Sequence, residues 1–187
     1  MQDAVYASLS SSLGMHWASQ GTNDLPPRTG NRHGGLAESP YNVYPTADGH
    51  IAIICVGEIH WRALVTEMGR PELSEDPRFS TLTARVAHID TVDALVGDWT
   101  AGQTKDALFQ RLMAAKVPCA PVRTLDEVVN DPNMHARGAL EWQDHPQLGR
   151  IVVQQSPLRY DGVPPHPLTP SRELGADTER VLGEIST

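Results

Sequence analysis

The chain is poor in cysteine and in aromatic residues, and it has no long apolar run. Only two of its 187 residues are cysteines, and Phe, Trp and Tyr together make up 5%. Neither Cys55 nor Cys119 has a second Cys or a His at metal-ligand spacing, so we expect two buried, reduced thiols and a cytoplasmic location. No apolar run reaches the roughly 20 residues of a membrane-spanning helix, and no charged leader precedes an apolar core.

Positive charge is also scarce. Fifteen Lys and Arg residues stand against 23 Asp and Glu residues, which gives a formal net charge of −8. No Lys/Arg cluster can neutralise successive phosphates, and few aromatic side chains are present to stack on bases. The eight histidines are scattered without metal-ligand spacing. We therefore expect no nucleic-acid partner, no membrane partner and no metal.

Extended arms flank the middle of the chain. Apolar residues at intervals of four predict an amphipathic helix over residues 3–19, with Val5 and Trp17 near its ends. Residues 21–40 are rich in Gly, Pro, Asn and Arg, which indicates an extended linker or a mobile loop. Residues 156–170 contain five prolines and should run extended over a surface. Arms of this length usually bind something or reach another body.

The compact part is predicted over about residues 41–130, as a small α+β domain. Two strands flank the turn Ala47-Asp48-Gly49, which is a strong hairpin signal. Periodic apolar residues then indicate three helices, the first of them ended by Gly69. The predicted strands cover 41–45 and 50–56, and the predicted helices cover 61–68, 82–99 and a stretch that starts at Thr104.

Shorter elements follow. Val117 to Val122 contains two prolines, so it is predicted as an edge strand or an extended connection. Thr124 and Glu127 form a capping box that opens a short helix, and Asp131-Pro132 interrupts that helix. A second hairpin is predicted from strands at 140–143 and 151–154, and a last helix starts near Asp177.

An ordered series of short motifs runs through nearly the whole chain. In this order it resembles the family III CoA-transferases, which include formyl-CoA:oxalate CoA-transferase, carnitine CoA-transferases and α-methylacyl-CoA racemase. One departure is the ending Leu174-Gly175-Ala176-Asp177-Thr178, where the family usually has Leu-Gly-Glu-His-Thr. The series is Pro40-Tyr41, Asp48-Gly49, Trp61, Asp76-Pro77-Arg78-Phe79, Arg85, Val117-Pro118-Cys119-Ala120-Pro121-Val122, Asp131-Pro132, Arg137-Gly138, Gly149 and Leu174-Gly175.

The resemblance implies a C-terminal fragment of a longer enzyme. Family members carry a Rossmann-like large domain ahead of the region that this chain resembles, and most of that domain has no counterpart here. Residues 1–20 would be its last helix, 21–40 a linker, 41–130 the small domain, and 131–187 a returning linker with the C-terminal segment. Met1 would then be an internal methionine or a start created by a gene break.

The resemblance also implies a reaction. Family members attack an acyl-CoA with an aspartate, release CoA, and pass it to an acceptor carboxylic acid. CoA is then a substrate, and neither a bound cofactor nor a metal is expected. The partners would be an acyl-CoA, a carboxylic acid and a second copy of the chain in an interlocked homodimer. The nucleophilic aspartate has no counterpart here, so we expect this chain alone to be inactive.

Two places are candidates for a site. In the oxalate enzymes a glycine-rich loop of the small domain covers the reactive intermediate, and His33, Gly34 and Gly35 lie where such a loop would precede the first strand. Glycine suits a lid because it tolerates unusual backbone angles and lets N–H groups approach an oxyanion. The alternative is a plain flexible linker.

Glu58 is the second candidate. In the racemase branch a functional glutamate precedes an aromatic residue by three positions, as Glu58 precedes Trp61. The alternative is a carboxylate that is placed at a helix N-terminus by the macrodipole. Arg78 and Arg85 are interpreted as structural, each bridging a carboxylate or carbonyl groups.

Three other functions stay open. The first is α-methylacyl-CoA racemisation, in which a proton is abstracted next to the thioester carbonyl. The second is a non-catalytic partner chain of a split enzyme, and the third is a remnant without function. Transferase and racemase differ in whether an acceptor acid is required.

Overall fold

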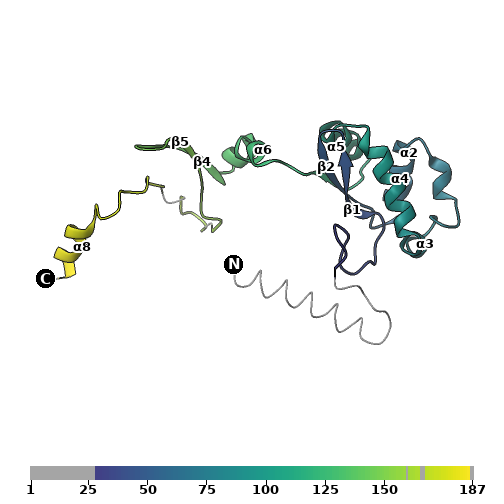
Figure 1. Ribbon diagram of the computed structural model, residues 1–187, viewed down its shortest axis with the longest axis horizontal. Coiled ribbons are helices and arrows are strands. Elements are labelled where there is room, and N and C mark those ends of the chain that lie inside the picture. Colours follow the sequence, from purple (N-terminus) through teal and green to yellow (C-terminus); the bar gives the residue numbers. More distant parts are fainter. Residues whose placement is uncertain (1–27, 159, 165–166, 186–187) are drawn as a thin grey trace, which may run out of the picture. The chain divides into compact units, whose positions relative to one another are not determined.

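The computed structural model describes residues 28–158, 160–164 and 167–185, and its contacts divide the chain after Val122 into two compact units (Figure 1). The helix predicted over residues 3–19 lies outside the described residues. The sequence predicts a small domain that ends near residue 130, whereas residues 123–130 belong to the second unit.

The first unit is built on a three-stranded antiparallel sheet. Strand β1 (Tyr41–Thr46) pairs with β2 (Gly49–Ile54), and β2 pairs with β3 (Cys119–Pro121), in the order β1-β2-β3. The predicted first hairpin is therefore confirmed, with Thr46 opposite Gly49. The prediction of an edge strand is confirmed as well, because Pro121 lies in β3 at the edge, where a missing N–H costs no ladder bond.

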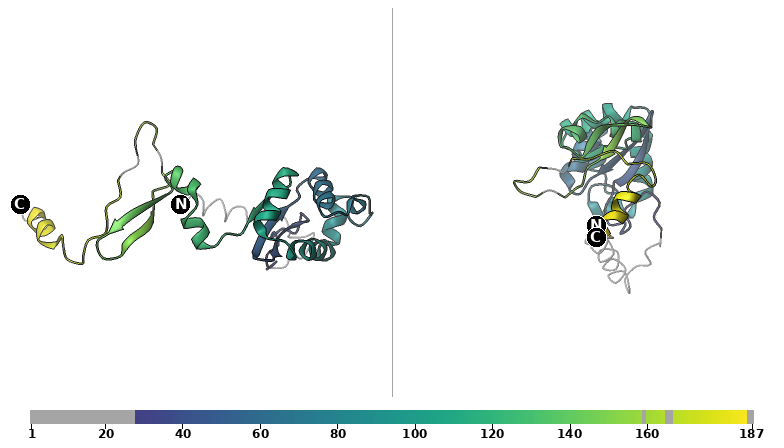
Figure 2. Two further views of the ribbon diagram at one scale, coloured as in Figure 1. Left: turned by 90° about the horizontal axis from the view of Figure 1, so that it is seen from above. Right: turned by 90° about the vertical axis from the view of Figure 1, so that its left-hand side faces the viewer.

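Helices cover one face of this sheet. Helix α4 (Ile89–Ala101) packs on β1, and helix α5 (Lys105–Ala114) packs on β2 and β3, an arrangement that can be followed in Figure 2. In the described part of the first unit the helices are α2 (Glu58–Glu67), the 3-10 turn η1 (Pro71–Ser74), α3 (Leu82–Ala87), α4 (Ile89–Ala101) and α5 (Lys105–Ala114). None of the helices in the described ranges is both long and apolar enough to cross a bilayer.

The core lies between the sheet and these helices. Alternate strand residues face the helices, so Tyr44, Ile51 and Ile53 are buried while their chain neighbours are not. The helices bury residues at spacings of three and four, as amphipathic helices do. They contribute Trp61, Leu64 and Val65 from α2, Val92 and Val96 from α4, and Leu108 and Leu112 from α5.

The other face of the sheet is apolar and only partly covered. Tyr41 lies opposite Ile54, and Ala52 lies opposite Ala120, so these side chains share the face away from the core. Tyr41 is 41% exposed, and Ala120 is also exposed. A hollow of about 330 Å³ lies over this face, with Asn31 on its wall.

The single helix predicted over residues 82–99 is wrong, since α3 and α4 are separate helices that meet at His88. His88 has φ −117° and ψ 30°, which are not helical angles. Helix α3 turns Arg85, rather than an apolar side chain, toward the interior, and α4 buries Val92 and Val96. Arg85, Val92 and Val96 have the spacing of one helix face, so their burial does not account for the break. No Gly or Pro in the sequence marks it.

Gly69 ends α2 as predicted. Its φ of +73° is the left-handed conformation that usually follows the last helical residue. Thr104 caps α5, because its hydroxyl accepts the Ala107 N–H. Asp48, in the turn of the first hairpin, accepts the Lys105 N–H at 2.8 Å and thereby joins that turn to the start of α5.

The described residues of the second unit form a two-stranded sheet and three helices. The capping box of Thr124 and Glu127 is confirmed, and Asp131 accepts the Asn133 N–H to cap the following helix. The second predicted hairpin is confirmed by the antiparallel pairing of β4 (Leu140–His145) with β5 (Gly149–Gln154). The elements in the described part of the second unit are α6 (Leu125–Val129), α7 (Pro132–Ala136), β4 (Leu140–His145), β5 (Gly149–Gln154) and α8 (Thr178–Ile185).

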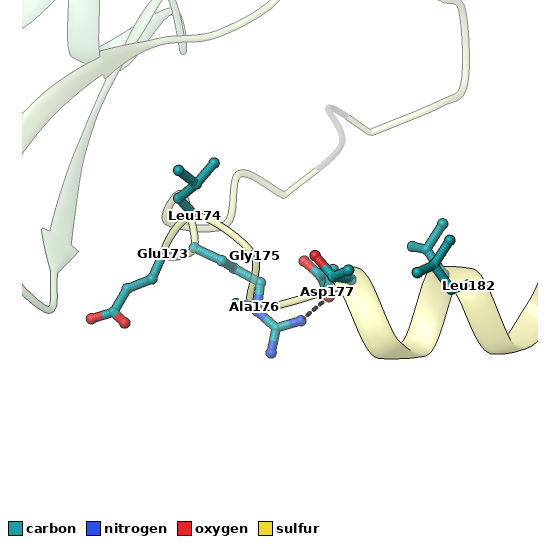
Figure 3. A pocket seen from close by; sticks show the side chains of 9 residues that line it. Glu173, Leu174, Gly175, Ala176, Asp177 and Leu182 are labelled. Atoms are coloured by element: carbon teal, nitrogen blue, oxygen red, sulfur yellow. Dashed lines mark hydrogen bonds and ion pairs between the residues drawn. The ribbon is translucent and has the colours of Figure 1, made fainter.

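Helix α8 confirms the predicted last helix, but its apolar side chains are exposed. Leu182 is 58% exposed and Ile185 is 76% exposed. Figure 3 shows Leu174 and Leu182 projecting from the preceding turn and from the helix, where they help to line a hollow of about 580 Å³. Asp177 pairs with Arg172 and Arg180 and so fixes the start of α8.

Candidate functional site

The side chain of Arg85 is fully buried and joins three segments of the first unit. Its Nε donates to the Ser39 carbonyl at 2.8 Å, and its Nη1 donates to the Phe79 carbonyl at 2.9 Å. The same Nη1 lies 2.7 Å from Glu58 Oε2, and the guanidinium carbon lies 5.2 Å from the centre of the Trp61 ring. The interpretation of Arg85 as a bridge between carbonyl groups and a carboxylate is therefore confirmed.

Arg78 makes a different bridge. It pairs with the Asp76 carboxylate two residues earlier, with Nη2 at 2.7 Å from Oδ2, and its side-chain hydrogen bonds to that carboxylate lie on the surface. The hydrogen bonds from the side chain and the N–H of Arg78 lower the pKa of Asp76 to about 2. This pair closes its own turn and does not connect two helices.

Glu58 begins α2, directly after the extended residue Gly57. Its Oε1 accepts the Leu82 N–H at 2.8 Å, at the start of α3, while its Oε2 faces Arg85. Burial alone would raise the pKa of Glu58, but the hydrogen bonds and the positive charge of Arg85 outweigh burial and hold that pKa below its usual value. The carboxylate is thus an ionised link between two helix starts, with 43% of its side chain exposed.

His60 does not pair with Glu58. Its Nδ1 accepts the Gly57 N–H at 3.4 Å, on the first turn of α2. Two apolar neighbours of Glu58 are open to solvent, Val56 at 52% and Ile59 at 68%. The start of α2 therefore presents one carboxylate between two exposed apolar side chains.

His33, Gly34 and Gly35 lie in a turn that is folded on itself. The Gly35 N–H donates to His33 Nδ1 at 2.8 Å, and the His33 ring packs edge-on against Tyr41 at 5.2 Å between centres. Among the described residues no hydrogen bond or ion pair joins these three residues to Glu58. The end of the same loop does reach the Glu58 cluster, which consists of Glu58, Arg85 and their bonded partners. The contact is the hydrogen bond that the Ser39 carbonyl accepts from Arg85 Nε.

Asp93 of α4 is a junction that the sequence analysis missed. Its Oδ2 accepts Arg32 Nε at 2.6 Å and Asn42 Nδ2 at 3.0 Å, and its Oδ1 accepts the Tyr44 hydroxyl at 2.7 Å. Burial and this bond raise the pKa of Tyr44. The available signal was an acidic residue directly beside the buried Val92, but nothing in the sequence names its partners.

The cysteines are free thiols of unequal exposure. Cys55 is buried, and burial raises its pKa to about 12, while Cys119 is half-buried with a raised pKa from the same cause. A thiolate nucleophile needs a lowered pKa, so neither residue is prepared for attack. Within the described ranges no three His, Cys, Asp or Glu side chains are arranged to hold a metal ion.

Comparisons with known proteins agree on one family. The sequence model described as CoA-transferase family III matches residues 1–178. The chain is 30% identical to a formyl-CoA:oxalate CoA-transferase of Streptomyces coelicolor and 32% identical to a succinate–glutarate CoA-transferase of Agrobacterium fabrum, over 87% of its own length in both cases. It spans only 40% of the length of each of these relatives.

A solved structure has a similar fold. A CaiB/BaiF family protein from Brucella suis superposes with a TM-score of 0.76 at 27% sequence identity. The superposition covers 92% of this chain and 44% of the Brucella chain. The mixed helix-and-sheet architecture predicted from the sequence is thus shared with a family member.

Proposed function

Since this chain belongs to CoA-transferase family III, we propose that it forms part of an enzyme that moves CoA between an acyl-CoA and a carboxylic acid. The observation that carries the proposal is the family match over residues 1–178, together with relatives that are named as CoA-transferases. The chain spans two fifths of the length of those relatives. The proposed activity is therefore that of an enzyme in which this chain is combined with the other segments that the relatives contain.

In this proposal the nucleophile is an aspartate of a polypeptide segment outside these 187 residues. Its oxygen attacks the thioester carbonyl, the carbon–sulfur bond breaks, and CoA leaves as the thiolate. The CoA thiolate then attacks the aspartyl carbonyl of the anhydride, so the donor acid leaves as its carboxylate and the aspartate becomes a CoA thioester. The acceptor carboxylate attacks this thioester and releases the CoA thiolate again. That thiolate attacks the acceptor carbonyl of the new anhydride, which forms the product acyl-CoA and restores the aspartate carboxylate. An acyl anhydride hydrolyses in water, so the proposal requires a site that is shielded from solvent.

Glu58 distinguishes the transferase from the racemase alternative. A base that abstracts a proton next to a thioester works best with a pKa near the operating pH. Glu58 instead has a lowered pKa, and each of its oxygens accepts a hydrogen bond. These contacts favour a carboxylate that positions α2 and α3, and they support transfer over racemisation. A direct catalytic role of Glu58 stays a prediction.

The proposal includes a lid and a second copy. Residues 33–35 would cover the acyl intermediate, since the loop that holds them ends at Ser39, which bonds to the Glu58 cluster through Arg85. The second copy is the other subunit of a homodimer, which would contain the same loop and the same Glu58 cluster. We expect the complete enzyme to run as a dimer in light scattering after size exclusion, and a monomer would remove this part of the proposal.

The experiment is a chimera in which this chain replaces the matched segment of the Agrobacterium relative. The chimera is incubated in D₂O with succinyl-CoA and glutarate, and separately with a chiral 2-methylacyl-CoA without an acceptor acid. Mass spectrometry follows the thioesters, and the unaltered Agrobacterium protein is the control. We expect glutaryl-CoA from the first mixture and no deuterium in the second.

The other outcomes are equally distinct. Deuterium at the α-carbon without an acceptor would replace the transferase proposal by the racemase alternative. A chimera that is folded by circular dichroism and binds CoA, but transfers nothing, would support the non-catalytic partner chain.

In an active chimera, Glu58→Gln should keep more than a tenth of the transfer rate if Glu58 only positions the helices. A loss of about 10²-fold or more would instead assign it proton transfer.

A further inference from the structure

Residues 29–36 form a strap whose shape is held by hydrogen bonds within it. The Thr29 hydroxyl donates to the Arg32 carbonyl at 2.7 Å, and the Leu36 N–H donates to the His33 carbonyl at 3.0 Å. Gly30 has φ +67° and provides the first turn without strain. Because these bonds are internal, the strap can change its position as one piece without losing them.

Arg32 provides the polar fastening of the strap to the first unit. Its Nε lies 2.6 Å from Asp93 Oδ2, and its Nη2 lies 2.8 Å from Asp90 Oδ1, both on α4. Among the described residues, every hydrogen bond or ion pair between the strap and the rest of the unit involves Arg32. In the part of the chain that the structure describes, the strap also makes a ring contact, that of His33 with Tyr41.

The two carboxylates are not equivalent. Asp90 is 89% exposed, so solvent and salt screen its attraction for Arg32. Asp93 is 12% exposed and is held by the Tyr44 hydroxyl and the Asn42 amide, both from β1. The contacts of Asp93 with β1 do not involve the strap, so they fix the position of its carboxylate. Asp93 is therefore the anchor to which Arg32 binds.

The strap also borders the hollow on the open face of the sheet. Asn31, the neighbour of Arg32, lies on the wall of that hollow, whose apolar surface includes Ala52 and Ile54. A displacement of Arg32 from α4 would carry Asn31 with it. The position of the strap and the access to the apolar face are thus coupled through adjacent residues.

We propose that Arg32 and Asp93 form a releasable latch, which holds the strap beside the open face of the sheet and opens access to that face when the ion pair breaks. The pair is well placed for this role because the anchor is fixed by the sheet, while the moving part carries only one charged side chain. The latch does not depend on CoA transfer and would operate in this chain alone.

The test is hydrogen exchange of the full chain, followed by mass spectrometry on peptides that cover residues 29–36. Arg32→Gln should accelerate exchange in the strap by roughly tenfold, because strap opening no longer breaks an ion pair. Asp93→Asn should act in the same direction, and Asp98→Asn, an exposed position on the same helix, is the matched control. Exchange in β2 should stay unchanged in Arg32→Gln.

Access is measured on a background with Ala52→Cys. Alkylation of that thiol by iodoacetamide, located by peptide mass spectrometry, should be faster when Arg32→Gln is added. A double-mutant cycle of Arg32→Gln and Asp93→Asn should show that the two changes are not additive. The proposal is overturned if Arg32→Gln leaves exchange in the strap unchanged. It is also overturned if exchange in the strap and in β2 rises by the same factor, which would indicate general destabilisation.

Discussion

At the scale of single residues, the first unit depends on a cation in its interior. Arg85 has no exposed surface, and its partners are two carbonyl oxygens and one carboxylate. Among the described residues its Nη2 has no hydrogen-bond partner, so the guanidinium is incompletely satisfied even with Glu58 present. Removal of the Glu58 carboxylate would leave the buried charge of Arg85 without its counter-charge, and this should lower the stability of the folded chain.

Glu58→Gln should therefore lower the free energy of unfolding by about 1–2 kcal/mol. The loss stays below that of a fully buried ion pair, because 43% of the Glu58 side chain is exposed. Urea unfolding followed by tryptophan fluorescence measures the change. Glu72→Gln, which breaks the exposed pair with Arg70, is the control and should have almost no effect.

The same variant should show a defined pH dependence. The pKa of Glu58 in the folded chain lies below its ordinary value of 4.5, so the unfolded chain takes up the proton first as the pH falls. The stabilisation by Glu58 is complete above about pH 4.5 and is lost as the pH falls through the lower, folded pKa. The difference in stability between the parent chain and Glu58→Gln should shrink over that range and stay constant above it. A difference that grows on acidification would contradict the ion pair.

The two thiols should react at very different rates. Cys55 is buried and its pKa is about 12, so at pH 8 it should be alkylated only when the unit opens. Cys119 is half-buried in the edge strand β3 and should react faster, although more slowly than a free cysteine because its pKa is raised. Iodoacetamide labelling with peptide mass spectrometry resolves both sites. Equal rates in the folded chain would contradict the burial of Cys55.

At the scale of elements, the ends of the helices show what local sequence decides. Gly69 ends α2 with φ +73°, whereas Gly102 ends α4 with φ −85°. A Cβ added at either glycine would meet no atom within 4 Å. The two positions therefore differ in backbone conformation and not in space, which makes them a matched pair.

Gly69→Ala should destabilise the chain by about 1 kcal/mol, because an L-residue is strained at positive φ. Gly102→Ala should be neutral or should stabilise the chain by about 0.5 kcal/mol, since alanine has fewer unfolded conformations to lose. Thermal unfolding by circular dichroism measures both. If the two variants shift the midpoint equally, backbone strain at Gly69 is not what distinguishes them.

The same scale shows why some elements were predicted and others were not. The hairpin at Ala47-Asp48-Gly49, the stop at Gly69 and the capping box at Thr124 are encoded in neighbouring residues, so the sequence was sufficient for them. The break at His88 has no local signal, and the buried Arg85 that precedes it bonds to Ser39 and Glu58, which are 46 and 27 residues away. Asp93 was missed for the same reason, because its partner Arg32 is 61 residues distant. Contacts of that range are fixed by packing and leave no local pattern.

At the scale of the whole molecule, the two units differ in how much they bury. The buried apolar side chains of the described residues lie between Tyr44 and Val117, all in the first unit. In the described part of the second unit, the buried side chain is that of His145, a polar residue in a two-stranded sheet. A two-stranded hairpin by itself is marginally stable in water. The cooperative unfolding of the chain should therefore belong to the first unit.

A polypeptide of residues 1–122 should keep the main unfolding transition, with a midpoint close to that of the 187-residue chain. Residues 123–187 alone should show no cooperative transition in the near-ultraviolet signal of Trp142. Leu112→Ala is the internal control: it should cost about 2–5 kcal/mol in both lengths, because Leu112 is fully buried and packs within the first unit. If deletion of residues 123–187 abolishes the transition, or if the cost of Leu112→Ala differs between the two lengths, the second unit contributes to the core and the division after Val122 is not an energetic one.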